Sequence, residues 1–449
     1  MSNLYKQAFT YAADFLSHAN TAPIQVDDRA RDNLKHLSYE LPEVGMNAEQ
    51  VISDLHQWVS PATMKMGSPR FFGFVIGGAY PVSVASNWLG TAWDQNTGLE
   101  KTTPGVAMLE KISANWMIDL LGLPTQSATA FVTGATLANF TALAAARNQV
   151  FRQAGWDVES DGLIGAPEVQ IIISEESHPT VYKSLGMLGF GRNRVTKVPT
   201  DDQGRMDLKH FPTVAENSII ITQAGNINSG AFDPIAEICD CVKDKNSWVH
   251  VDGAFGLWAM ASFQMKHLGA GLEKADSWAT DAHKWLNVPY DSGLAFVKNA
   301  DTLKAAMAIT ASYLPTENAE RNPSDYTPEL SRRARGIDIY AVLRHLGRAG
   351  VAELIERCCA CARRFAHLFS KAGYEVMNDV VLNQVVVCFG SKERNLRIMD
   401  AVQKDGTCWV GQTIWHDRLV MRISVCNWQT DFNAVDESFA VIKGIADKL

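Results

Sequence analysis

The chain has 449 residues, of which 47% are hydrophobic and 20% are charged. This balance is typical of a globular protein that folds without disulfide bonds. The formal net charge is −8, and the longest basic cluster is Arg332-Arg333-Ala334-Arg335. Nucleic-acid binders usually carry a basic stripe, so the composition excludes a nucleic-acid partner. No run of 18 or more apolar residues occurs in the sequence, and we therefore expect no membrane span.

The cysteines predict free thiols rather than a disulfide framework or a metal site. Cys358, Cys359 and Cys361 lie in one predicted helix, and their spacing does not match a zinc site. We therefore predict buried thiols in a reducing compartment and no metal ion. Residues 1–22 also lack the basic start and continuous apolar stretch of a secretory signal. Together these features predict a cytoplasmic protein.

The first 121 residues show helical periodicity, interrupted by Pro61 and by the Gly67-Ser68-Pro69 cluster. The predicted helices span residues 4–18, 47–59, 81–94 and 107–121. From residue 128 onward, short apolar strands alternate with helices; the predicted strands span residues 128–132, 169–174, 194–198, 218–222, 248–252, 277–280 and 293–297. This alternation predicts an α/β domain with a mostly parallel sheet that is buried on both faces.

The pattern changes after Arg335, which predicts a second and smaller domain. A long helix at 337–371 precedes predicted strands at 375–376, 384–389, 407–410 and 421–424, and a final helix begins near residue 433. The sequence therefore predicts a helical segment (1–75), a large α/β domain (76–335) and a small α+β domain (336–449).

Two polar residues at predicted strand ends indicate a cofactor site. Lys284 follows the strand at 277–280, and Asp252 ends the strand at 248–252. Ligands of open α/β sheets bind at the carboxyl ends of the strands, so both side chains should face one site. A lysine amine attacks a carbonyl, and a carboxylate keeps a cationic ring nitrogen protonated. Each residue alone is weak support, since surface lysines and strand-end aspartates are common.

Two further segments fit the same site. Thr133-Gly134-Ala135-Thr136 lies between a strand and a helix, where free backbone N–H groups and the helix dipole favour a phosphate. His178 opens another helix, where its ring can stack on a planar cofactor. Ala254, next to Gly253, leaves room for a flat ring. One cofactor, pyridoxal 5'-phosphate, accounts for the helix start, the imidazole, the carboxylate and the amine together.

These segments resemble the pyridoxal-phosphate-dependent decarboxylases of the aromatic-amino-acid and glutamate decarboxylase group. The resemblance covers nearly the whole chain and is carried by His178, His250-Val-Asp252-Gly-Ala254 and Asp281-Ala-His283-Lys284-Trp285-Leu286. It implies a fold-type-I transferase architecture. It also implies a homodimer with active sites at the interface, in which the N-terminal helical segment packs on the partner subunit.

The same resemblance implies roles for four further residues. In the family, a tyrosine of a mobile loop helps to protonate the carbanion left by CO₂, and Tyr326 matches that tyrosine. His283 would contact the cofactor phosphate or assist proton transfer, and Arg422 would bind the substrate carboxylate. Asn226 would replace a hydroxyl that contacts the cofactor's phenolic oxygen in relatives. An ordinary surface tyrosine is the alternative interpretation of Tyr326.

Two positions depart from the family pattern. Gly225-Asn226-Ile-Asn228-Ser stands where several relatives have a Gly-Thr-Thr stretch. Asp281 stands where aromatic-amino-acid decarboxylases carry an asparagine near the phosphate. A carboxylate there would repel the phosphate unless it turned away, so the phosphate contacts cannot be copied from relatives.

The expected reaction is decarboxylation of an L-amino acid to the amine and CO₂. Phe74 and Trp93, among the aromatic residues at 71–93, favour an aromatic or bulky apolar substrate. A core or dimer-interface role suits these residues equally well. The alternatives are an acidic amino acid as substrate, or transamination, aldehyde synthesis or carbon–carbon lysis on the same cofactor.

Overall fold

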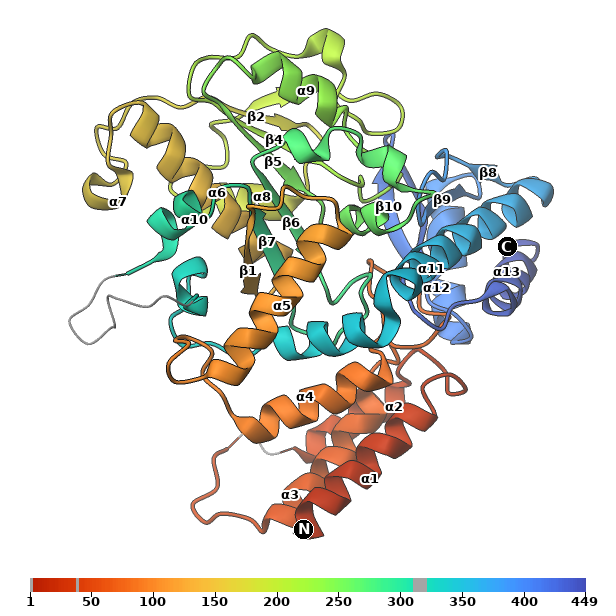
Figure 1. Cartoon of the computed structure of the whole chain (residues 1–449). Helices are drawn as coiled ribbons and strands as arrows, with labels where there is room; N and C mark the ends of the chain where they lie inside the picture. The colour runs from red at the N-terminus through yellow and green to blue at the C-terminus, as the bar shows by residue number, and fades with distance from the viewer. Residues whose placement is uncertain (1–2, 38–39, 310–320) are drawn as a thin grey trace. The chain divides into compact units, whose positions relative to one another are not determined.

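The computed structural model describes residues 3–37, 40–309 and 321–449 (Figure 1). Contacts group the chain into two units. The first unit comprises residues 1–78, 364–377 and 386–449, and the second comprises residues 79–363 and 378–385. The N-terminal residues thus share a unit with the C-terminal ones, whereas the sequence predicts a separate helical segment. Packing of that segment on a partner subunit stays a prediction.

The second unit is built on a seven-stranded sheet. Its strands are β1 (Ala128–Val132), β2 (Ile171–Ser174), β3 (Thr196–Val198), β4 (Ile219–Gln223), β5 (Trp248–Asp252), β6 (Ser277–Asp281) and β7 (Gly293–Val297), in the order β1-β7-β6-β5-β4-β2-β3. The pairs from β3 to β6 are parallel, and β7 runs antiparallel to both β6 and β1. The predicted α/β fold with a mostly parallel seven-stranded sheet is confirmed.

Burial on both faces explains why these strands are short apolar runs. Every residue of β1, β2 and β4 to β7 is buried. Helix α6 (Ala135–Gln153) packs on β1, β5, β6 and β7 and against helices α8 (Pro179–Met187) and α10 (Ala300–Met307) (Figure 1). Its buried face consists largely of alanines, which allow the helix to lie close to the sheet.

A close backbone approach brings the start of α6 to the carboxyl edge of the sheet. Gly293 pairs with Val132 on one side and with Asp281 on the other. A Cβ atom on Gly293 would lie 2.4 Å from the Cα atom of Gly134, so no larger residue fits at position 293. Gly134 and the end of β6 are neighbours for this reason.

The other helices of the second unit are α4 (Pro81–Trp93), α5 (Pro104–Leu120), α7 (Val158–Asp161) and α9 (Ile235–Val242). Helix α11 (Gly336–Lys371) begins in the second unit and ends in the first, close to its predicted bounds of 337–371. It is interrupted at Gly347, whose φ of 61° and ψ of −176° are accessible only to glycine.

The first unit contains a four-stranded sheet with the order β10-β11-β9-β8. Its elements are α1 (Asn3–Ser17), α2 (Asp28–Asn33), α3 (Ala48–Asp54), β8 (Glu375–Val376), α12 (Lys392–Asp405), β10 (Gly411–Trp415), β11 (Arg418–Ser424), α13 (Phe432–Ala446) and most of β9 (Gln384–Cys388), whose first two residues belong to the second unit.

One predicted strand of this sheet is wrong. Residues 407–410 form no strand, apart from an isolated bridge between Trp409 and Phe71. The strand starts instead at Gly411 and turns at His416 and Asp417, whose φ angles of 48° and 59° suit a two-residue hairpin. β10 is an edge strand with an exposed Gln412, so it lacks the apolar signature by which buried strands were found.

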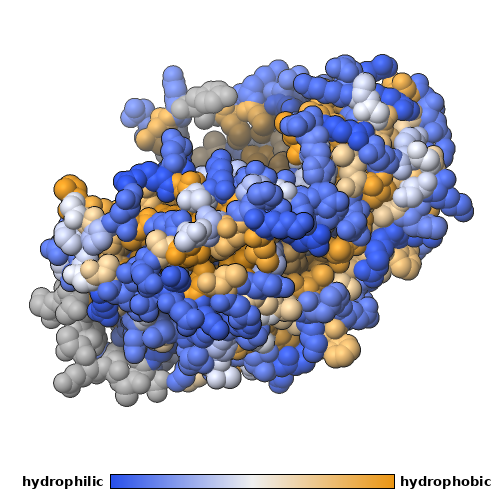
Figure 2. Space-filling model, turned by 90° about the horizontal axis from the view of Figure 1, so that it is seen from above, coloured by the Kyte–Doolittle hydropathy of each residue, from blue (hydrophilic) through white to orange (hydrophobic). Residues whose placement is uncertain are grey.

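Hydrophilic residues cover much of the face shown in Figure 2, with apolar residues between them. Among the described residues, no helix is long and apolar enough to cross a bilayer.

Candidate active site

A cavity of about 520 Å³ opens at the carboxyl edge of the large sheet. Nine of the predicted site residues line it: Thr133, Gly134, Ala135, Thr136, His178, Asp252, Ala254, His283 and Lys284. They come from the start of α6, the start of α8, the end of β5 and the turn after β6. Parallel strands end at the same edge, which is why positions far apart in sequence meet.

The N-terminus of α6 is an anion site that already holds a carboxylate. Gly134 caps this helix and supplies no side-chain acceptor. The Ala135 N–H donates instead to Oδ1 of Asp281 at 2.5 Å. A negative charge is favourable at this position because the helix dipole and the free N–H groups point toward it. Asp281 thus does not turn away from the helix start.

The same carboxylate holds the predicted cofactor lysine. Oδ2 of Asp281 lies 3.0 Å from Nζ of Lys284, and the two side chains are 3% and 20% exposed. Lys284 follows the end of β6 by three residues, in the turn that returns the chain to β7. Asp281 therefore connects the amine of Lys284 to the helix start.

Asp252 is held by two hydrogen bonds at the end of β5. Its Oδ1 accepts from the Ala254 N–H at 3.2 Å, and its Oδ2 accepts from Nδ2 of Asn139 at 3.1 Å. Asn139 lies on the buried face of α6 and is fully buried. The sequence analysis missed Asn139, which with Asn148 is one of two amides among the buried residues of this alanine-rich helix.

A buried hydrogen-bond chain leads to Asp252. Trp248 Nε1 donates to Ser277 Oγ at 2.8 Å, and Ser277 Oγ lies 2.8 Å from Nδ1 of His250. His250 Nε2 lies 2.9 Å from Oδ1 of Asn139, whose amide N–H₂ is directed at Asp252. Because the indole can only donate and the carboxylate can only accept, every bond in the chain has one direction. His250 consequently carries its proton on Nε2.

Burial supports this neutral form of His250. Removal from water lowers the pKa of His250 to about 3, since an imidazolium is costly in a fully buried position. The chain of hydrogen bonds therefore brings no positive charge to Asp252.

Each of the two other histidines of the site accepts a hydrogen bond at Nδ1. His178 caps α8, and its Nδ1 accepts from the Thr180 N–H at 3.3 Å. His283 Nδ1 accepts from the Ser292 N–H at 3.1 Å, and its ring stacks on Tyr290. Burial lowers the pKa of His283 and outweighs the opposing effect of Asp281. Its Nε2 lies 3.5 Å from Asp281, on the cavity side of the helix start.

Asn226 does not line the cavity. Its side chain closes a turn, accepting from the N–H groups of Asn228 and Ser229 and donating to Glu176. Gln223, at the end of β4, lines the cavity instead. Its side chain is 4% exposed, and Nε2 has no hydrogen-bond partner among the described residues. Gln223 is therefore the better-placed amide donor, and the sequence analysis missed it.

Tyr326 is also outside the cavity lining. It is 7% exposed and packs in the core formed by α6 and the sheet. The guanidinium of Arg321 lies 4.2 Å from its ring centroid. The catalytic role of Tyr326 therefore stays a prediction.

The three predicted substrate residues lie elsewhere in the chain. Trp93 ends α4, is 47% exposed and does not line the cavity. Phe74 and Arg422 belong to the first unit, where the Phe74 carbonyl accepts from Arg422 at 3.2 Å. Burial lowers the pKa of Arg422 to about 10. The two residues therefore lie next to one another within the first unit.

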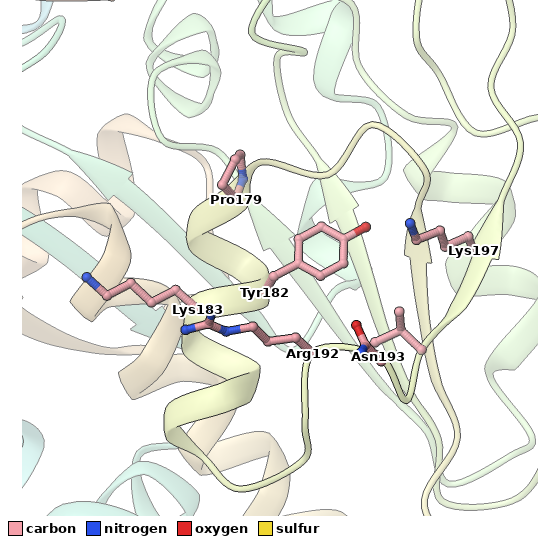
Figure 3. Close-up of a pocket in the computed structure, with 7 residues that line it drawn as sticks. Pro179, Tyr182, Lys183, Arg192, Asn193 and Lys197 are labelled. Atoms are coloured by element: carbon pink, nitrogen blue, oxygen red, sulfur yellow. The ribbon is translucent and has the colours of Figure 1, made fainter.

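A second hollow of about 650 Å³ adjoins α8 and β3 and is rich in cations (Figure 3). Arg192, Lys197 and Lys183 line it with Tyr182, and Lys183 also lines the cavity of Lys284. In Figure 3 the Lys183 side chain extends away from Tyr182 and Lys197.

The residues that line the cavity of Lys284, at the edge of the seven-stranded sheet, fit pyridoxal phosphate. Backbone N–H groups at the start of α6 suit its phosphate, Asp252 its ring nitrogen, and Lys284 its aldehyde. The fold and these residues define a pyridoxal-phosphate enzyme of fold type I.

Comparison with known proteins identifies the family. The pyridoxal-dependent decarboxylase conserved domain matches residues 31–392, and the chain belongs to this family. It is a pyridoxal-phosphate-dependent carboxy-lyase. The aromatic-L-amino-acid decarboxylase of Bacillus atrophaeus is 25% identical, over 100% of this chain and 96% of its own length.

Solved structures show the same fold. Mouse CSAD matches with a TM-score of 0.91 and 21% identity, covering 99% of this chain and 98% of its own. Oryza sativa TDC, solved with PLP and tryptamine, matches with a TM-score of 0.90 and 21% identity, covering 99% and 97%.

Proposed function

We propose that the protein decarboxylates an L-amino acid with an aromatic or bulky apolar side chain, releasing the amine and CO₂. The observation that carries this proposal is the meeting of Lys284, Asp252 and His178 in one cavity next to the α6 N-terminus. When bound, pyridoxal phosphate supplies an electron sink for the pair left behind by the departing carboxylate.

Four residues of the chain are assigned the remaining roles in cofactor binding and proton transfer. Lys284 would hold the cofactor through its side-chain amine. Asp252, fixed by Asn139 and Ala254, would keep a proton on the ring nitrogen by a charge-assisted hydrogen bond. We assign Gln223 to the phenolic oxygen, the role predicted for Asn226. His178 is assigned to the ring face and to the proton that replaces CO₂.

Two observations favour an apolar substrate. Leu137, Met187, Ile227 and Phe255 contribute apolar surface to the cavity. The Bacillus relative acts, by its name, on aromatic amino acids, and it matches this chain over its whole length. An aromatic side chain would lie against the apolar wall while polar groups orient the reacting end.

Lys183 favours a second candidate, an acidic amino acid. Its side chain reaches the cavity wall and is exposed, so its ammonium is available to a substrate carboxylate. Under this alternative, Lys183→Met would raise the KM for the acidic substrate and leave any aromatic substrate unaffected.

A panel of carboxyl-labelled L-amino acids tests the proposal. The purified holoprotein is incubated with tryptophan, tyrosine, phenylalanine, leucine, glutamate and aspartate, and labelled CO₂ and the product amine are measured. We expect an aromatic amino acid to react fastest, with one amine formed per CO₂. Release of ammonia and peroxide would instead indicate aldehyde synthesis, and a keto acid would indicate transamination. Lys284→Ala should abolish release, while Lys274→Ala, an exposed lysine outside the cavity, should not.

We further propose a cytoplasmic homodimer. Helix α4 exposes Trp88, Leu89 and Trp93, and helix α1 exposes Tyr5 and Phe9. Large apolar side chains at this density are typical of an interface between subunits. Sedimentation equilibrium should give twice the 49.3 kDa chain mass; a monomer at micromolar concentration would contradict it.

A further inference from the structure

We infer that Asp281 is an internal competitor of the cofactor phosphate: its carboxylate holds the α6 N-terminus and Lys284 together until the phosphate displaces it. The inference rests on the cofactor site described above and adds to the proposed function a residue that sets how tightly the cofactor is held.

Asp281 occupies the position that the phosphate requires. Its Oδ1 accepts from the Ala135 N–H at 2.5 Å, and this N–H is one of the free donors of the first helical turn. A Cβ atom on Gly134 would lie 3.5 Å from the same oxygen, so the carboxylate fills the space beside the cap. A phosphate bound to these donors would meet a carboxylate oxygen within a few ångströms.

Two anions at such a distance repel strongly in a site screened from water. Asp281 is 2% exposed, so little solvent is present to weaken the repulsion. Binding of the phosphate must therefore either move the carboxylate off Ala135 or overcome its charge. In both cases Asp281 lowers the affinity of the site for phosphate.

Asp281 also restrains the reactive amine. The amine of Lys284 lies 3.0 Å from Oδ2 of Asp281, so this contact must break or shift before the nitrogen can attack the cofactor's aldehyde. Displacement of the carboxylate from Ala135 loosens the same side chain that holds Lys284. Arrival of the phosphate and release of the amine are therefore coupled through one residue.

If the role of Asp281 is purely structural, its removal should have the opposite effect on phosphate affinity. If the carboxylate only closes the helix start and stays in place, its removal leaves Ala135 and Lys284 without their partner. The site would then be distorted, and phosphate would bind no better or more weakly. The sign of the change in affinity thus separates the two roles.

The test uses inorganic phosphate as the probe on purified protein from which cofactor has been removed. Asp281→Asn keeps the shape of the side chain and removes its charge. We expect it to bind phosphate about tenfold more tightly than the wild-type protein in equilibrium dialysis, because a like charge has been removed. Unchanged or weaker binding, including no measurable binding in either protein, would overturn the inference.

Asp276→Asn is the matched control. Asp276 is partly buried and also accepts from a backbone N–H, that of Val249 at 2.9 Å, but it does not line the cavity. It should leave phosphate affinity unchanged; an equal gain would show that the effect of position 281 is not local. Asp281→Ser provides a second uncharged variant in case the asparagine does not fold, as judged by circular dichroism, and it should also bind phosphate more tightly.

Titration with pyridoxal 5'-phosphate and with pyridoxal completes the experiment. The gain in Asp281→Asn should be larger for the phosphorylated ligand, because only that ligand has a phosphate for the α6 N-terminus; an equal gain for both would overturn the inference. The CO₂ assay on the same wild-type preparation is independent of these affinities. A protein that binds cofactor but releases no CO₂ contradicts the proposed function alone.

Discussion

Asn139 donates a hydrogen bond to Asp252 at 3.1 Å from the buried face of α6. The helix whose N-terminus would receive the phosphate therefore also holds the carboxylate that would face the ring nitrogen. One helix would thus position both ends of a bound cofactor, and His250 fixes the Asn139 amide from behind. This arrangement makes Asn139 a positioning residue rather than a catalytic one.

Replacing Asn139 should weaken cofactor binding. Asn139→Leu removes a hydrogen bond to a charged group, which is worth about 1.5–3 kcal/mol, so the cofactor Kd should rise about 10- to 100-fold. Absorbance titration of the cofactor-free protein measures it. Asn148→Leu, a substitution on the same helix outside the cavity, serves as the control. Equal Kd values for Asn139→Leu and the wild-type protein would contradict the positioning role.

His250 should make the fold sensitive to acid. Burial lowers the pKa of His250 from 6.5 to about 3, so between these values the unfolded chain binds a proton that the folded chain does not. Stability contributed by the neutral imidazole is present above pH 6.5 and is lost as the pH falls toward 3. The slope from this residue is at most about 1.4 kcal/mol per pH unit.

Urea unfolding at several pH values measures this slope. His250→Gln lacks the titrating group, so its stability should fall less steeply than that of the wild-type protein between pH 6.5 and pH 4. If the free energies of unfolding of the two proteins fell equally with pH, His250 would not be the residue that binds a proton on unfolding.

The residues that could be predicted from the sequence are those at the carboxyl ends of strands, where ligands of α/β sheets bind. His178 and Lys284 follow a short apolar strand and Asp252 ends one, and the parallel sheet brings such positions to one edge. Asn139 and Gln223 were not predicted. The role of Asn139 depends on which face of α6 packs on the sheet, and that of Gln223 depends on the direction of the last side chain of β4. Asn226 was named by analogy with relatives, yet its side chain is used by its own turn.

The other predictions concern residues whose surroundings come from distant parts of the sequence. Tyr326 was matched to the mobile-loop tyrosine by resemblance to the family, and its catalytic role stays a prediction; in the structure it packs in the core of α6 with Arg321 over its ring. The position of β10 was missed because some side chains of this edge strand are exposed, so its sequence is not a continuous apolar run. Asp281 was recognised as unusual from the sequence, but its bond to Ala135 depends on the register of β6, β7 and β1.

Glu110 should be essential for the stability of the second unit. It is fully buried and accepts two hydrogen bonds from Arg332 at 2.6 and 2.7 Å, with Arg321 at 3.5 Å. Glu110→Ala leaves buried arginines without a counter-charge, which should cost about 3–5 kcal/mol. The midpoint of urea unfolding reports the loss.

Asp119→Asn is the comparison for this variant. Asp119 pairs with Arg348 on the surface, where the side chains are 76% and 60% exposed, so its loss should change the midpoint little. A Glu110→Ala midpoint equal to that of Asp119→Asn would contradict the account of the buried cluster.

The thiols should differ sharply in reactivity. Cys241 is exposed, and the other seven cysteines are buried. Burial raises the pKa values of Cys239, Cys358 and Cys408 to about 12, so little thiolate is present at neutral pH. A disulfide reagent should therefore modify one thiol rapidly in the native protein and all eight in urea. Rapid modification of three or more native thiols would contradict this packing.

Identification of the residue that binds the cofactor tests the central claim most directly. Borohydride reduction of the purified holoprotein fixes a cofactor that is held through a lysine amine, and peptide mass spectrometry then locates it. We expect the added mass on Lys284 alone, and none in Lys284→Ala. Cofactor fixed to another lysine, or no fixation in a protein that contains bound cofactor, would contradict the assignment of this cavity as the active site.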